Sequence, residues 1–163
     1  NQGGGAPGDR HYDLLKGFGD AVQLFYDDCE DMGIIDDTVI VVWSEFGRRV
    51  KQNGNGTDHG SLGPVFVVGG SVVGGLYGNH PDISPAGLDP QGNVAYSQDP
   101  LNPHRATDFR DVYGTILAQW LCLPEATILS QVLPPETLAY DPQKYWVDGK
   151  HDFDLGFLPP AGP

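Results

Sequence analysis

The sequence predicts an α/β fold, with part of a mostly parallel sheet flanked by helices that this chain alone does not complete. Three features predict the α/β class. A long amphipathic helical pattern comes first, two short runs of largely β-branched residues follow, and a second helical pattern comes after a long irregular stretch. Continuous apolar runs of this length are typical of strands buried on both faces, as in parallel sheets. A helix followed by such a strand indicates α/β architecture.

The first predicted helix begins after Asp9. From there to Cys29, apolar residues recur at steps of three and four, so that one face of the helix is apolar. Asp9 is placed to cap the N-terminus, and Gly33 is placed to end the helix. Gly17 and Gly19 lie in its interior, and each weakens the helix by up to about 1 kcal/mol unless another segment packs closely there.

The two predicted strands are Thr38–Trp43 and Pro64–Val68. Two strands cannot cover each other's edges, so we expect them to neighbour strands from another segment or another chain. The residues between them, 44–63, are polar and rich in glycine. We expect these residues to form a loop that passes over the carboxyl edge of the sheet.

The second half of the chain begins with an irregular stretch, residues 71–106, of a length that is often functional. A helix is predicted from Phe109 to Leu121. Thr107 or Asp108 caps this helix, and Asp108 is placed to form an ion pair with Arg110.

A shorter helical stretch is predicted from Pro124 to Leu133, and the chain then becomes rich in Pro and Asp. We therefore divide the chain into a domain portion, residues 1–133, and a tail, residues 134–163. We expect the tail to lie over the surface or to lead elsewhere.

The composition is strongly acidic, with 9 Lys and Arg against 22 Asp and Glu and a net charge of −13 at pH 7. Nucleic acids and anionic membrane surfaces both call for a basic face, so we expect neither as a partner. No apolar run approaches the roughly 18 residues of a membrane span. Cys29 and Cys122 could pair, but both lie in helical patterns, and we expect buried free thiols.

Candidate chemistry is concentrated around Glu45, Arg48 and His59. Glu45 comes directly after the first predicted strand, where ligands bind in parallel α/β sheets. His59 offers an imidazole ligand for a metal ion, and Arg48 can bind phosphate or sulfate through paired N–H donors. Two interpretations stay open on these residues alone. They form a metal or substrate site, or Glu45 pairs with Arg48 while His59 hydrogen-bonds to loop carbonyls.

A set of motifs, in order along the chain, is similar to a known family. The motifs are Trp43-Ser44-Glu45-Phe46-Gly47-Arg48-Arg49, Asn53, Gly56-Thr57-Asp58-His59-Gly60, Gly74-Gly75-Leu76-Tyr77-Gly78, Thr107-Asp108-Phe109-Arg110-Asp111-Val112-Tyr113 and Trp120-Leu121. In these motifs the chain resembles the carboxyl-terminal part of the bacterial domain-of-unknown-function family 1501. That family is grouped with the sulfatases and alkaline phosphatases. The resemblance covers residues 1 to about 133 and leaves out the tail.

The resemblance implies one or two metal ions at the carboxyl edge of an alkaline-phosphatase-like sheet. In such enzymes a Ser, Thr or modified Cys attacks phosphorus or sulfur, and the metal ions stabilise the developing charge. Glu45 falls where these enzymes have the Asp of an Asp-His ligand pair, Phe46 falls where they have the His, and His59 falls at a later His. The resemblance therefore implies Glu45 and His59 as ligands of a divalent metal ion: zinc, manganese, iron or calcium.

Further roles follow from the same resemblance. Arg48 would contact the anionic substrate. Ser44, Asn53 and Asp58 would lie behind the metal ligands and support them.

The chain departs from the enzymes' pattern in two ways. Phe46 cannot bind a metal ion, so a second metal ion is in doubt, and we expect the ring to point into the core. The nucleophile of such enzymes lies much earlier in their chains, and no Ser, Thr or Cys here has the setting of an activated nucleophile. We therefore expect the nucleophile and further metal ligands to come from an N-terminal part of the same protein or from a second chain.

The sequence thus favours a metal-dependent hydrolase of phosphate or sulfate esters that acts on a small anionic ester, with this chain supplying part of the metal site. The alternative is a non-catalytic binding or assembly protein on the same scaffold. Similar proteins often carry export signals, so we expect an extracytoplasmic location, either periplasmic or secreted. His11, near the start of the first helix, is a further candidate site residue.

Overall fold

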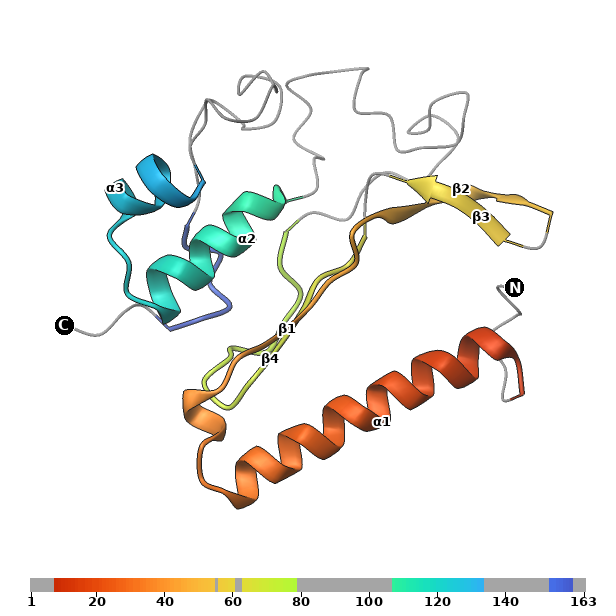
Figure 1. Ribbon diagram of the computed structural model, residues 1–163, viewed down its shortest axis with the longest axis horizontal. Coiled ribbons are helices and arrows are strands. Elements are labelled where there is room, and N and C mark those ends of the chain that lie inside the picture. Colours follow the sequence, from red (N-terminus) through yellow and green to blue (C-terminus); the bar gives the residue numbers. More distant parts are fainter. Residues whose placement is uncertain (1–7, 55, 61–62, 79–106, 134–152, 160–163) are drawn as a thin grey trace. The chain divides into compact units, whose positions relative to one another are not determined.

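A computed structural model describes residues 8–54, 56–60, 63–78, 107–133 and 153–159 (Figure 1). It combines helices with two small antiparallel sheets, so the predicted mixture of helix and strand is confirmed. The chain divides into two compact units. The first comprises residues 1–71 and 83–94, and the second comprises residues 72–82 and 95–163. Each unit is described by itself below.

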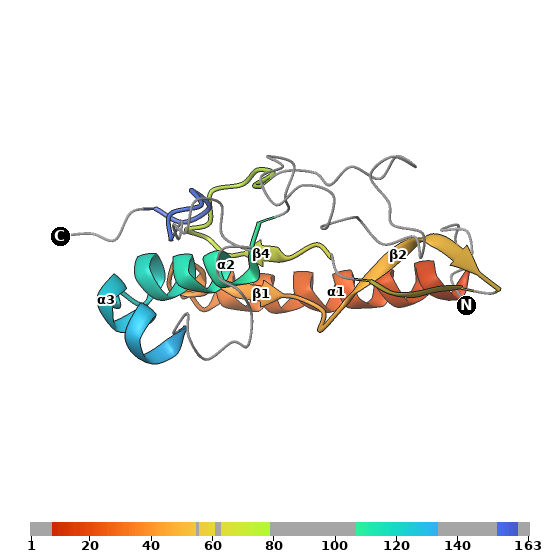
Figure 2. The ribbon, with the colours of Figure 1, turned by 90° about the horizontal axis from the view of Figure 1, so that it is seen from above.

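The first unit begins with the helix α1, Arg10–Asp31, an unbroken helix in Figures 1 and 2. Asp9 occupies the N-cap position as predicted, although its side chain makes no capping hydrogen bond. The helix ends at Met32, and Gly33 follows with a φ of +69°, a left-handed conformation that glycine adopts without steric cost. Large apolar side chains of α1 are exposed, namely Leu14, Leu15, Phe18, Leu24 and Phe25.

After the 3₁₀ turn η1 (Ile35–Asp37), two three-residue strands follow, β1 (Ile40–Val42) and β4 (Phe66–Val68). Both strands lie within the predicted segments, but they pair antiparallel with each other, with Val41 opposite Val67. The mostly parallel sheet that the sequence predicts, with neighbours from another segment or chain, is not shown: within the described residues these two strands pair with each other. The chain that leaves β1 turns back through a hairpin instead of a helical crossover, and a hairpin connection gives antiparallel neighbours.

The two strands are also less covered than the sequence predicts. All three residues of β1 are half-buried, and Phe66 in β4 is 56% exposed. The end of β4 is tied to η1, because Gly70 N donates to Ile35 O at 3.1 Å and Ser71 Oγ donates to Asp36 O at 2.9 Å. These two hydrogen bonds hold the end of β4 next to η1, the turn that precedes β1.

The segment between β1 and β4 forms a hairpin and not the loop that the sequence predicts. Its strands are β2 (Gly47–Asn53) and β3 (Gly56–Gly60), and Asn53 pairs with Gly56 beside the turn. Gly54 has a φ of +46°. Asn-Gly sequences favour the left-handed turns that join adjacent strands, so the repeated Asn-Gly of residues 53–56 accounts for the hairpin.

In the second unit, residues 107–133 form four short helical segments in sequence. They are α2 (Phe109–Thr115), the π-helical η3 (Ile116–Trp120), α3 (Glu125–Thr127) and the π-helical η4 (Ile128–Val132). The predicted helices after Asp108 and after Pro124 are therefore confirmed in position. Asp108 is the N-cap of α2, and its side chain accepts a hydrogen bond from Arg110 N.

Part of the tail does not lie on the surface as expected. Phe153, Phe157 and Leu158 are buried together with Thr115 and Ile128, and they form the core of the second unit. A Cβ atom at Gly114 would overlap the Phe153 ring, so this glycine allows the ring to approach α2 closely. The remaining residues of the tail, 134–152 and 160–163, lie outside the described residues.

Both cysteines are free, as expected, but only Cys29 is buried. Cys122 is exposed, because η3 ends at Trp120 and the chain leaves the helix with a φ of +53° at Cys122. No helix within the described part of the chain is long and apolar enough to cross a membrane.

Candidate functional site

Two of the predicted site residues, Arg48 and His59, lie near the base of the β2–β3 hairpin. Arg48 in β2 lies directly opposite His59 in β3, and Gly47 lies opposite Gly60. A Cβ atom at Gly63 would lie 3.5 Å from the Gly47 Cα, so the backbone that leaves β3 passes close to the start of β2. Two chain segments that are separate in the sequence therefore bring Arg48 and His59 side by side.

Phe46 lies on His59 instead of in the core. The two rings are stacked, with their centroids 3.6 Å apart and their planes inclined by 17°. Phe46 is half-buried, whereas His59 is exposed. The expectation that Phe46 points into the core is wrong, because the hairpin presents an imidazole face on which an apolar ring can lie.

Arg48 lies next to this ring pair. Its Cζ atom is 5.2 Å from the centroid of the Phe46 ring, within the range of a cation–π contact. One guanidinium nitrogen, Nη1, donates a hydrogen bond to Thr57 O in β3 at 3.0 Å. The guanidinium is thus positioned by Phe46 and by Thr57 in β3, and Arg48 is exposed.

Glu45 lies in the bend that leads into β2 and is exposed. Its neighbour Ser44 donates a long hydrogen bond of 3.4 Å from Oγ to Glu45 Oε2. Asp58 is exposed on β3 next to His59. Asn53 occupies the last position of β2, and its side chain lies outside the described residues. The prediction that Glu45 and His59 share a metal ion stays a prediction.

The donor chemistry fits a divalent cation only in part. A carboxylate and an imidazole are suitable ligands for such ions. Among the residues that the structure describes, however, no group of three or more His, Cys, Asp or Glu could hold a metal ion. Stacking uses the face of the His59 ring, whereas a metal ion binds to a nitrogen lone pair in the ring plane. The contact with Phe46 therefore leaves the ligand function of His59 possible, and a complete site needs further ligands.

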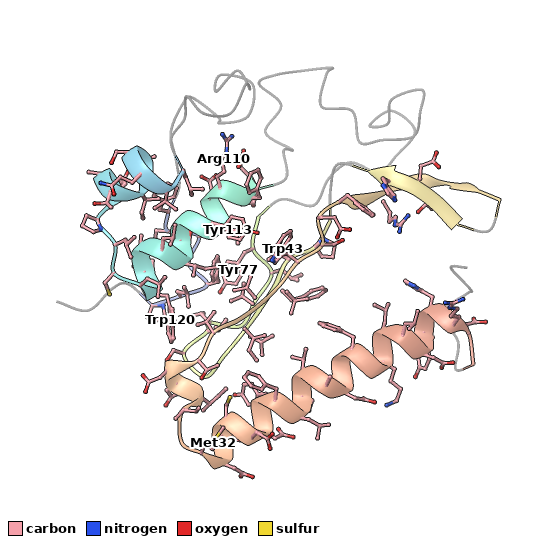
Figure 3. The ribbon with its side chains drawn as sticks, in the orientation of Figure 1. Met32, Trp43, Tyr77, Arg110, Tyr113 and Trp120 are labelled. Atoms are coloured by element: carbon pink, nitrogen blue, oxygen red, sulfur yellow. The ribbon has the colours of Figure 1, made fainter. Side chains whose placement is uncertain are left out.

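A second polar cluster lies at the start of α2, where Arg110 projects from the first turn (Figure 3). Arg110 is only 3% exposed. It donates from Nε to Asp108 Oδ1 at 2.8 Å and from Nη2 to Asp108 Oδ2 at 2.7 Å. The predicted ion pair is confirmed, and both partners are used to build the helix start. His11, the further candidate, is half-buried in α1.

A comparison with protein families identifies the chain over most of its length. The model of the family described as a protein of unknown function, DUF1501, matches residues 5–121. The chain belongs to the DUF1501 family. No curated protein and no solved structure matches it.

The DUF1501 match includes α1, the strand pairs β1–β4 and β2–β3, and α2. It ends at Leu121, the residue that follows η3. Glu45, Arg48, His59 and the stacked Phe46 therefore all lie within the family region. The buried residues Phe153 to Leu158 lie outside it. The stack of Phe46 on His59 was missed at the level of sequence, because it depends on the hairpin register. The Asn-Gly turn signal of residues 53–56 is the one feature that points to that register.

Proposed function

We propose that this chain supplies part of the metal site of a hydrolase that acts on phosphate or sulfate esters. The proposal rests on one observation above all: the hairpin places Arg48 directly opposite His59, a few residues from Glu45. An imidazole, a carboxylate and a guanidinium are the groups that bind a metal ion and the anionic ester it activates. The resemblance to sulfatases and alkaline phosphatases supports the same function.

In this proposal Glu45 and His59 bind a divalent cation, which when present polarises the ester and stabilises its negative charge. Arg48 holds a phosphoryl or sulfuryl oxygen through its exposed N–H groups while Thr57 O fixes its orientation. Ser44, Asn53 and Asp58 support the ligands from behind. The nucleophile and the remaining metal ligands come from an N-terminal part of the protein or from a second chain.

The same proposal places β1 and β4 in a larger, alkaline-phosphatase-like sheet. Exposed apolar side chains support it: Trp43, which follows β1, is 57% exposed, and Phe66 in β4 is 56% exposed. Apolar exposure that is concentrated in one place marks a surface that another protein segment covers. An extracytoplasmic location also belongs to the proposal and rests on the export signals of similar proteins.

A non-catalytic binding or assembly protein is the second candidate. It is favoured by Phe46, which stands where the resemblance implies a metal-binding His and which stacks on His59. It is also favoured by the absence of a group of three ligands within the described ranges. In this case the exposed Arg48 and the ring pair would serve to recognise a partner.

The metal content of the purified intact protein distinguishes the two candidates. After dialysis against zinc or manganese, we expect about one bound ion per chain by elemental analysis. The variants Glu45→Gln and His59→Ala should each lower the affinity by at least about tenfold, since loss of even a supporting residue costs about 10–100-fold. Glu30→Gln, which removes an exposed carboxylate of α1, is the matched control and should retain the ion. An intact protein that binds no ion would favour the non-catalytic candidate.

A further inference from the structure

We propose that residues 153–158 bind the second unit as a tethered peptide, and that the surface they cover is a peptide-binding surface for short segments of the pattern Phe-x-x-x-Phe-Leu. The residues that contact the segment define this surface, which is called the α2 surface below: Val73, Tyr77, Gly114, Thr115 and Gln119. The inference goes beyond the proposed function and does not depend on it, because Arg48 and His59 lie in the first unit.

The backbone of the segment is held by groups outside the segment. The hydrogen bonds run from Val73 N to Phe157 O at 2.9 Å, from Gln119 Nε2 to Phe153 O at 3.5 Å, and from Leu155 N to Thr115 Oγ1 at 3.4 Å. The described part of the tail, residues 153–159, forms no helix or strand. In peptide recognition, hydrogen bonds to the main chain of the ligand give affinity, and these bonds fit that role.

The side chains of the segment give the contact its specificity. The Phe153 ring lies against Gly114, where a Cβ atom would overlap it, and the Phe157 ring meets Tyr77 edge to face with the centroids 5.9 Å apart. Buried anchors are separated by exposed residues: Phe153, Phe157 and Leu158 are buried, and Asp154 and Gly156 are exposed. A peptide that is read through pockets for some of its side chains has this pattern.

The α2 surface and its occupant belong to different parts of the chain. The whole surface lies within residues 5–121, which the DUF1501 family model matches, whereas the segment lies beyond that match. Residues 134–152 separate the segment from η4 in the sequence and act as its tether. Tethering raises the effective concentration of a ligand, so the chain's own segment keeps the surface covered against free competitors.

The proposal requires that the segment can leave while the rest of the chain keeps its fold. A specific protease site inserted between Gln143 and Lys144 of the full-length chain allows the tether to be cut after folding, without a change to any buried side chain. We expect the cut protein to keep its helical circular dichroism. A fluorescent synthetic peptide of residues 151–160 should then replace the cut segment, as measured by fluorescence anisotropy.

The uncut protein and two altered peptides are the controls. The uncut protein should bind the peptide at least about 100-fold more weakly, because its own segment competes from a tether. A peptide with Phe157→Ala should bind the cut protein at least about tenfold more weakly, as expected for a buried aromatic anchor. A peptide with Pro159→Ala is the matched control and should bind like the unaltered one, because Pro159 is exposed.

Two results would overturn the proposal. A cut protein that unfolds, or that stays folded and takes up no peptide, would show that the segment is an inseparable part of the core. Equal binding by the cut and the uncut protein would show that the peptide binds elsewhere. Neither result bears on the proposed hydrolase, whose test is the metal content of the intact protein.

Discussion

Asp108 serves two purposes at the start of α2. Its carboxylate caps the helix by accepting a hydrogen bond from Arg110 N at 2.9 Å, and it also pairs with the Arg110 guanidinium through both oxygens. The side chains are only 4% and 11% exposed for Arg110 and Asp108 respectively. A buried cation that loses its carboxylate destabilises a fold far more than a missing surface ion pair does.

We therefore expect Asp108→Ala to lower the free energy of unfolding by about 3–5 kcal/mol. Asp108→Asn should cost about 1 kcal/mol less, because asparagine still caps the helix while its amide carries no charge. The measurement is urea unfolding followed by circular dichroism.

The control for this prediction is Asp20→Asn, which breaks the exposed ion pair between Lys16 and Asp20 in α1. Both of its side chains are 58% exposed, so we expect a change of at most about 0.5 kcal/mol. If the changes at position 108 and position 20 cost the same, the buried pair does not have the role described for it.

At the scale of elements, the interior glycines of α1 stand without neighbours. A Cβ atom at Gly17 or Gly19 would meet nothing within 4 Å. From the sequence, we expect these glycines to weaken the helix unless another segment packs closely against them. Within the described residues of the first unit, no segment does so. Their effect is then purely on the helix backbone.

Replacing Gly17 and Gly19 with alanine should therefore stabilise the protein by about 0.5–1 kcal/mol at each position, because alanine has less backbone entropy to lose. Thermal unfolding of the single and double variants measures this. A loss of stability would mean that another segment or chain packs against this part of α1 in the intact protein. That result would support the larger sheet and its partners that are proposed above.

The elements also show which physical signals a sequence carries. The ends of α1 were predictable, because the cap position and the left-handed glycine act locally. The strands β1 and β4 were predictable from their β-branched runs. Their pairing was not, since it is decided by the intervening hairpin, whose polar strands lack the alternation that identifies strands. The Phe46 stack depends on that hairpin and was mispredicted for the same reason.

At the scale of the whole molecule, residues far apart in the sequence form the core of the second unit. Val73 N donates to Phe157 O at 2.9 Å, and Tyr77 meets the Phe157 ring edge to face at a centroid distance of 5.9 Å. Leu155 N reaches Thr115 Oγ1 at 3.4 Å. The chain after the DUF1501 match is thus part of the folded unit, which no local pattern in its Pro- and Asp-rich sequence indicates.

Phe157 is the residue that tests this arrangement most directly, since it is 4% exposed and contacts Tyr77. Phe157→Ala should cost about 3–5 kcal/mol, the range for removing a buried aromatic ring, and should speed amide hydrogen exchange in α2. Leu121→Ala is the control, because Leu121 is 55% exposed and a surface change costs at most about 0.5 kcal/mol. Equal stability of the two variants would show that the segment from Phe153 to Leu158 does not fill the core. Exchange that quickens in α2 only for Phe157→Ala would instead establish that the second unit folds around the end of the chain.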